Sequence, residues 1–293
     1  MTNCELTPRQ RREREFFDEY WSRYRDSAQV NLDAIAGKEH RPWNPYWCIF
    51  ESAKRLYESG ARKLLDFGCG GGVNAVILAT LGFEVTGFDI SPRCVETAKQ
   101  VAEAHQLSDR CHFSVQASES LEYPDEYFDV VVGIDILHHV EIASSVAECL
   151  RVLASGGTAL FKEFVEVPAI DRFRNTAVVR VFFPKEKILD HWVYITEDER
   201  KMNDQDIALI RELCPNLTEK RFTVFARLDR LLRRPGDRCA SFLEKFDYWL
   251  CNKIPALNRL GGSVVLELYK NPASNKGEGL YRRKVSAAKI RSS

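Results

Sequence analysis

Two carboxylates flank a glycine-rich turn in the segment LLDFGCGGGVNAVILATLGFEVTGFDIS, residues 64–91. Asp66 stands just before the glycines, and Asp89 ends the apolar run that follows them. A strand that runs into a glycine turn and then into a helix lets a ligand approach the backbone closely, and the usual ligands of such turns are nucleotides. The segment therefore predicts a nucleotide-type cofactor site.

The glycines can be aligned in two registers, and charge favours one of them. Read from Gly70, GGGVNA fits a dinucleotide pattern, but Asp66 would repel the pyrophosphate that such a ligand places at the helix N-terminus. S-adenosylmethionine (SAM) has no phosphate, and its sulfonium and ammonium groups suit a carboxylate. Asp89 lies 21 residues after Gly68, the position of an acid that accepts hydrogen bonds from ribose hydroxyls. We therefore expect SAM as the cofactor.

Three motifs carry a resemblance to a known family: DFGCGGG, GFDIS and FDVVVGIDILHHV. They resemble successive motifs of the class I SAM-dependent methyltransferases, most closely the small-molecule "methyltransferase type 11" group. The resemblance covers roughly residues 60–165, and the final strands more loosely. It implies that the first motif holds the methionine and adenosine parts of SAM and that Asp89 holds the ribose. The predicted cofactor-binding residues are Asp66, Gly68, Cys69, Gly70, Gly72, Asp89, Ile90, Gln116, Ala117 and Asp135.

Gln116 marks a departure from the family pattern. Members of the family often carry an acid after the third strand, which bonds the adenine amino group, whereas the segment here reads SVQASESL. The side-chain carbonyl of Gln116 can accept that hydrogen bond instead, with the backbone of Ala117 or Ser118 as donor.

The predicted catalytic residues are His138, His139 and Glu163. Methyl transfer needs an aligned acceptor and the exclusion of water, and an oxygen or nitrogen acceptor also needs a base. Imidazole titrates near neutral pH, so either histidine can serve. The alternative is that one histidine caps the strand end and the other faces solvent. Glu163 either orients a base or acceptor, or forms a surface salt bridge with Lys162.

A metal site is an alternative to these roles. Asp135, His138 and His139 form the pattern D-x-x-H-H, which resembles a stretch of some quinone O-methyltransferases that hold a divalent metal. Carboxylate and imidazole groups are plausible ligands. This chain has His138 where that pattern has an acid, so we expect no metal.

The elements that must position these residues alternate regularly. Strands are predicted at 63–67, 84–89, 111–116, 128–137, 157–164, 221–228 and 262–270, and helices at 46–59, 73–81, 92–106, 141–154 and 204–214. Apolar strands that alternate with helices predict a parallel sheet covered on both faces, with ligands bound at the carboxyl ends of its strands. With the resemblance, we expect an α/β fold, a Rossmann-like, doubly wound, mostly parallel seven-stranded sheet.

Three parts of the chain lie outside this core pattern. Residues 1–60 form a helical extension in which Thr7 and Pro8 begin an amphipathic helix that either packs on the domain or covers the site as a lid. The SAM-binding domain spans 61–270 and carries an insertion at about 165–204, rich in basic and aromatic residues, that either caps the acceptor site or mixes surface and core positions. The tail at 271–293 is basic and predicted to be disordered.

Composition limits the partners. The chain has 293 residues, 45% of them hydrophobic, and a net charge of zero, which gives no support to nucleic-acid binding. The expected partner is a small-molecule or lipid-like acceptor. Aromatic residues at helical spacing in 242–250, with arginines at 230–234, fit either a core stripe or contact with a membrane surface.

Nine cysteines, with no CxxC pair, indicate reduced thiols and a cytoplasmic protein. The sequence predicts neither a signal peptide nor a membrane-spanning helix. The predicted function is SAM-dependent transfer of a methyl group to an oxygen, nitrogen or carbon atom of the acceptor. The alternatives are an NAD-type oxidoreductase and a non-catalytic protein that binds SAM.

Overall fold

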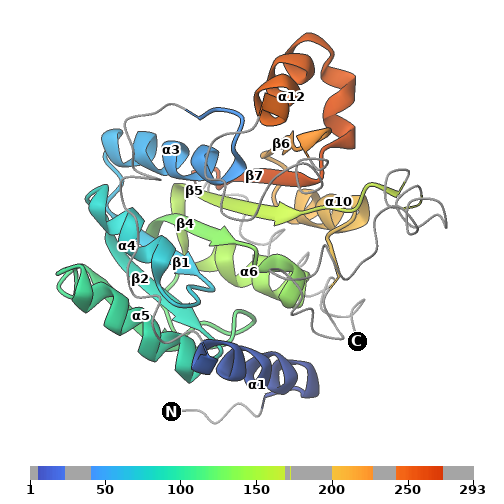
Figure 1. Ribbon diagram of the computed structural model, residues 1–293. Helices are drawn as coiled ribbons and strands as arrows, with labels where there is room; N and C mark the ends of the chain where they lie inside the picture. Colours follow the sequence, from blue (N-terminus) through green and yellow to red (C-terminus); the bar gives the residue numbers. More distant parts are fainter. Residues whose placement is uncertain (1–5, 24–40, 169–171, 173–199, 227–241, 273–293) are drawn as a thin grey trace.

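A seven-stranded sheet forms the centre of the molecule (Figure 1). The computed structural model describes residues 6–23, 41–168, 172, 200–226 and 242–272. The strands are β1 (Lys63–Phe67), β2 (Glu84–Asp89), β3 (Cys111–Val115), β4 (Phe128–Ile134), β5 (Leu153–Phe164), β6 (Leu217–Phe222) and β7 (Ser263–Tyr269). Their order is β3-β2-β1-β4-β5-β7-β6, and only β7 runs antiparallel to its neighbours. The predicted doubly wound, mostly parallel sheet is confirmed.

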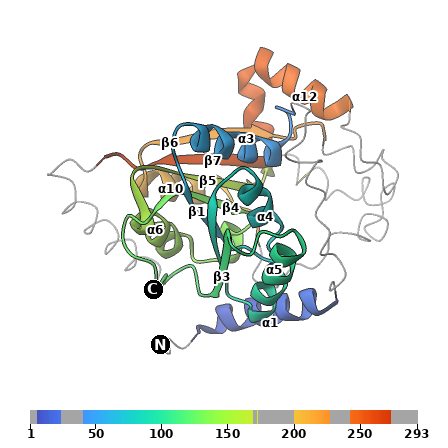
Figure 2. The same cartoon turned by 90° about the vertical axis from the view of Figure 1, so that its left-hand side faces the viewer.

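Helices cover both faces of the sheet (Figures 1 and 2). On one face lie α3 (Pro45–Glu58), α4 (Val73–Thr80) and α5 (Pro92–Ala104), and on the other α6 (Ile142–Val152) and α10 (Asp204–Leu213). Each face buries its own apolar cluster. Leu64 and Val130 pack under α3 and α4, while the adjacent Leu65 and Val131 pack under α6 and α10. The alternation of side chains along each strand thus divides the core into two layers.

Three predicted strands have wrong boundaries. β5 begins at Leu153 and not at 157, inside the helix predicted at 141–154, and β6 begins at Leu217 and not at 221. β4 and β6 also end earlier than predicted, and backbone geometry explains these two ends. β4 ends at Ile134 because Asp135 adopts a positive φ of 56°, and a 3-10 turn, η1 (Leu137–His139), follows. The strand predicted at 221–228 instead ends at Phe222, because Thr223 has a φ of 61°. For residues other than glycine, a positive φ lies outside the β region that a regular strand needs.

The N-terminal helix α1 (Pro8–Arg23) begins as predicted at Thr7. The side chain of Thr7 accepts from the Gln10 amide at 3.3 Å, and the Gln10 side chain accepts from the Thr7 amide at 2.9 Å, which makes a reciprocal cap. Figure 2 shows that α1 lies beside α5, against which it packs. The helix crosses the end of the sheet where β1, β2 and β4 terminate.

The C-terminal part adds α12 (Phe242–Lys253) and the 3-10 helix η3 (Pro255–Leu260). The expectation of a core stripe on α12 is wrong for Phe242 and Trp249, whose side chains are exposed. No helix in the described part of the chain is both long and apolar enough to cross a membrane. Most of the insertion predicted at 165–204, the arginines at 230–234 and nearly all of the tail lie outside the described residues.

Candidate active site

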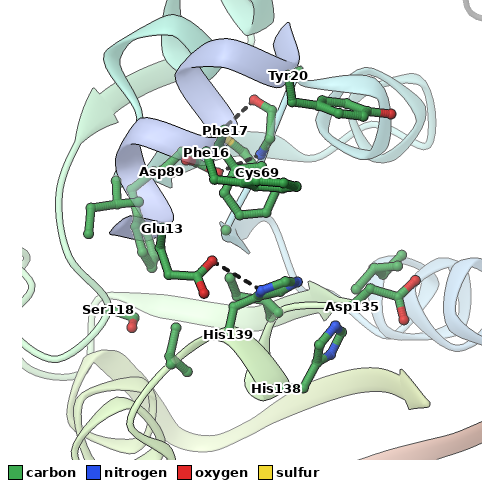
Figure 3. A pocket seen from close by; sticks show the side chains of 18 of the residues that line it. Glu13, Phe16, Phe17, Tyr20, Cys69, Asp89, Ser118, Asp135, His138 and His139 are labelled. Atoms are coloured by element: carbon green, nitrogen blue, oxygen red, sulfur yellow. Dashed lines mark hydrogen bonds and ion pairs between the residues drawn. The ribbon is translucent and has the colours of Figure 1, made fainter. Parts of the chain in front are cut away.

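A cavity of about 630 Å³ lies between the carboxyl ends of the central strands and α1 (Figure 3). Neighbouring strands β1 and β4 lead to crossovers in opposite directions, so the cavity sits at the point where open α/β sheets bind ligands. It brings together nine of the predicted site residues: Gly68, Cys69, Gly70, Asp89, Ile90, Gln116, Asp135, His138 and His139. Asp66, Gly72, Ala117 and Glu163 do not line it.

The glycine turn connects β1 to α4, and two of its positions require glycine because each contacts a different neighbour. Gly68 has a φ of 76°, and a Cβ there would come within 2.6 Å of the Ile136 side chain. Gly72 has a φ of 81°, and a Cβ there would lie 2.7 Å from the backbone of Ala98 on α5. Gly72 therefore allows α4 and α5 to pack closely and does not itself face the cavity.

Asp89 fixes the shape of the turn. Its two carboxylate oxygens each accept a backbone hydrogen bond of 2.9 Å, one from Gly70 and one from Ser91. Burial raises the pKa of Asp89, while these hydrogen bonds act in the opposite direction. The carboxylate is thus tied to the turn on one side and lines the cavity on the other.

Asp66 lies beneath the turn and is almost completely buried. Burial, and next the charge of Asp89, raise its pKa to about 7. The repulsion of a pyrophosphate by Asp66, inferred from the sequence, is therefore weaker than expected, because the carboxyl is partly protonated at neutral pH. Asp89, which faces the cavity, is the better placed of the two acids for a cofactor contact.

Gln116 is committed mainly to the loop that follows β3. Its side-chain carbonyl accepts from the Glu122 amide and its NH₂ group donates to the Ser114 hydroxyl, both at 2.8 Å. An acid does line the cavity here, because Glu119 lies three residues further along. Glu119 is not among the residues predicted from the sequence, although it lies in the segment SVQASESL.

His138 and Glu163 form a buried pair. Nδ1 of His138 lies 2.6 Å from the Glu163 carboxylate, which also accepts from the amides of Ile136 and Leu137 at 2.9 and 2.7 Å. The alternative of a surface salt bridge between Glu163 and Lys162 is wrong, because Glu163 is fully buried and the two neighbours project to opposite faces of β5. Glu163 therefore orients the imidazole and the η1 turn from inside the protein.

Lys162 belongs to a second buried group, which neither the motifs nor their spacing predict. Its ammonium lies 2.7 Å from the Asp135 carboxylate and 3.1 Å from the hydroxyl of Tyr46, which in turn donates to Asp135 at 2.9 Å. Burial raises the pKa of Asp135, and Lys162 opposes that rise. Asp135 reaches the cavity with its charge already balanced by this lysine.

His139 lies beside His138 at the cavity wall. The two ring centroids are 4.2 Å apart, and the centroid of the imidazole lies 5.3 Å from that of the Phe17 ring of α1, in an edge-to-face arrangement. The rings do not diverge, as side chains of adjacent residues on a strand would, because η1 is a 3-10 turn. Nδ1 of His139 is 3.2 Å from a carboxylate oxygen of Glu13, also on α1 (Figure 3).

Asp135, His138 and His139 therefore each have a different main partner: Lys162, Glu163 and Glu13. Within the described residues, no group of three or more histidine, cysteine, aspartate or glutamate side chains is arranged to hold a metal ion.

α1 is held over the cavity at both ends. Near its start, the Gln10 side chain donates to Glu119 at 2.9 Å. Further along, Asp18 accepts from the Ser91 hydroxyl and the Arg93 amide at the start of α5. Near its end, Trp21 lies directly on Gly71, where a Cβ would come within 2.3 Å of the ring. The two expectations for this helix are compatible, because α1 packs on the domain and also forms one wall of the cavity.

Proteins of similar sequence are named as methyltransferases. Residues 65–161 match the family of the methyltransferase domain. The chain is 38% identical over 109 residues to the 27-O-demethylrifamycin SV methyltransferase of Amycolatopsis mediterranei (36% of this chain, 40% of the relative). It is 33% identical over 158 residues to the ubiquinone biosynthesis O-methyltransferase of Xanthomonas campestris pv. campestris (48% of this chain, 63% of the relative). The matches thus span less than two thirds of these relatives.

Among solved structures, the geranyl diphosphate C-methyltransferase of Streptomyces coelicolor A3(2) superposes with a TM-score of 0.51 at 15% identity, over 90% of this chain and 99% of the other. At that identity the likeness concerns the fold alone. The sequence matches support a class I SAM-dependent methyltransferase domain at residues 65–161.

Proposed function

We propose that the protein is a methyltransferase that binds SAM and transfers its methyl group to a hydroxyl oxygen of a small-molecule or lipid-like acceptor. One observation carries the proposal. A histidine held by a buried carboxylate, His138 with Glu163, lines the same cavity as the glycine turn and Asp89. A cofactor site and an oriented base in one cavity are what methylation of a hydroxyl requires.

The residues of the cavity would divide the work. The glycine turn, with Cys69 as a small side chain within it, would admit the cofactor, and Asp89 would accept hydrogen bonds from the ribose. SAM supplies an electrophilic methyl group on a sulfonium. His138 or His139 would take the proton from the acceptor hydroxyl as the carbon–oxygen bond forms and the carbon–sulfur bond breaks. Glu163 would act through His138, because it is buried behind the ring.

The walls of the cavity favour an acceptor with an apolar or aromatic body. Phe16, Phe17 and Phe164 line it together with Ile134 and Val140. The names of the relatives, which concern ubiquinone biosynthesis and a rifamycin, agree with an O-methylated ring. A phenol or hydroxyquinone that carries an apolar substituent is therefore the acceptor class that we propose.

Calorimetric titration with SAM, S-adenosylhomocysteine (SAH) and NAD tests the cofactor. We expect SAM and SAH to bind the wild type and to bind Asp89→Ala far more weakly. Binding of NAD alone would favour the oxidoreductase alternative and overturn the proposal. A screen of phenols and hydroxyquinones with methyl-labelled SAM then tests catalysis. Binding of SAM without transfer to any acceptor of these classes would instead favour a non-catalytic SAM-binding protein.

A further inference from the structure

Glu13 is a buried carboxylate on a helix whose other glutamates are exposed. Its side chain is 5% exposed, whereas Glu15 and Glu19 on the same helix face solvent. Carboxylates are rarely buried unless they are paired. The inner face of α1 therefore delivers an acid into the cavity, and that acid meets His139 (Figure 3).

The contact joins a carboxylate to an imidazole, which are the two groups of a carboxylate–histidine pair in catalysis. Oε2 of Glu13 and Nδ1 of His139 are 3.2 Å apart, at hydrogen-bond distance although not aligned as a hydrogen bond. Phe17 and the ring of His138 confine the imidazole on two other sides. Nδ1 is thus the nitrogen that faces the acid.

We propose that Glu13 is a positioning residue that holds His139 in the tautomer whose Nε2 accepts the proton of the acceptor. The inference rests on the proposed function. Nδ1–H donates to Glu13, so the Nε2 lone pair is left for the acceptor hydroxyl. When that proton moves to Nε2, the carboxylate stabilises the resulting imidazolium, while Glu13 itself gains no proton.

The two carboxylate–histidine pairs differ in the element that carries the carboxylate. Glu163 comes from β5 in the centre of the sheet, so His138 is oriented whether or not the cavity is covered. Glu13 comes from α1, which is attached through Gln10 and Asp18. His139 is therefore oriented only while α1 lies over the cavity, which is also the condition under which water is excluded.

The tautomer of His139 can be measured without knowing the acceptor. The protein is labelled with ¹⁵N-histidine, the signals of His139 are assigned from their loss in His139→Gln, and long-range ¹H–¹⁵N spectra are recorded at pH 8 with and without SAH. We expect a single Nδ1–H tautomer in the wild type. Glu13→Leu should change this to a mixture of tautomers. Glu13→Gln keeps an acceptor oxygen, so His139 should remain mostly in the Nδ1–H tautomer in that variant.

Glu15→Leu is the matched control, because Glu15 lies on the exposed face of the same helix and should leave the spectrum unchanged. A His139 signal that is the same in Glu13→Leu as in the wild type would overturn the proposal, as would an Nε2–H tautomer in the wild type. Failure of the proposed function would look different, because the wild type would then either fail to bind SAM and SAH or bind SAM without transferring its methyl group to any phenol or hydroxyquinone, whatever the tautomer of His139.

Discussion

The carboxylate of Glu163 and the imidazole of His138 meet 2.6 Å apart, and neither side chain is open to solvent. The same carboxylate receives the amides of Ile136 and Leu137, so all of its main contacts hold the η1 turn at the end of β4. One buried acid thus fixes both the backbone turn and the ring that faces the cavity. Side chains that position a functional group in this way are expected to affect stability as well as activity.

Replacement of Glu163 should test that double role. Glu163→Ala leaves two buried amides and the His138 ring without their acceptor, so we expect the free energy of unfolding to fall by roughly 3–5 kcal/mol. Glu163→Gln keeps one acceptor oxygen, so its free energy of unfolding should fall by less than that of Glu163→Ala. Urea denaturation of both variants provides the measurement. Equal stability of Glu163→Ala and the wild type would contradict this assignment of Glu163.

The buried ion pair of Lys162 and Asp135 leads to a second prediction. Lys162→Met should leave the Asp135 carboxylate without its cation and lower the free energy of unfolding by roughly 3 kcal/mol. The double variant Lys162→Met, Asp135→Asn removes both charges, so it should be more stable than the single variant Lys162→Met. Thermal and urea unfolding of the four proteins complete a double-mutant cycle. Strict additivity would indicate that the two charges do not interact.

Asp66 predicts a specific dependence of stability on pH. Its pKa is about 7 in the folded protein, against an ordinary value of 3.8. Between these two values the folded state holds a proton that the unfolded state has lost, so the contribution of Asp66 is greatest below pH 4 and declines as the pH rises to about 7.

The variant Asp66→Asn cannot titrate and isolates this effect. We expect its stability, relative to the wild type, to increase as the pH is raised from 4.5 to 7.5. Urea denaturation of both proteins at a series of pH values measures the difference. If that difference stayed constant across the range, the Asp66 carboxyl would already be ionised in the folded protein.

Asp18 should control how firmly α1 is held. Asp18→Ala removes the acceptor for the Ser91 hydroxyl and the Arg93 amide, while Ser91 still caps α5 by accepting from Cys94. We therefore expect faster tryptic cleavage at the arginines of α1 and weaker binding of SAH, with a loss of global stability of only about 1 kcal/mol. Glu15→Ala, on the exposed face of the same helix, is the control. Unchanged cleavage in Asp18→Ala would mean that other contacts hold α1.

The sequence by itself determined the sheet and the place of the site. Apolar strands that alternate with helices leave few topologies for the chain, and the glycine turn and Asp89 follow β1 and β2 directly. Because the carboxyl ends of parallel strands meet at one edge, residues 68–70, 89 and 135–139 had to lie close together. These inferences depend on local pattern and connectivity, which a sequence displays.

Only the tertiary structure decided how the charged side chains pair. Lys162 and Glu163 are neighbours in the sequence, yet they serve different groups on opposite faces of β5. Glu13 meets His139 across more than a hundred residues, and Tyr46 reaches Asp135 from α3. Such pairings depend on the packing of α1 and α3 against the sheet, and neither periodicity nor spacing specifies which carboxylate meets which cation.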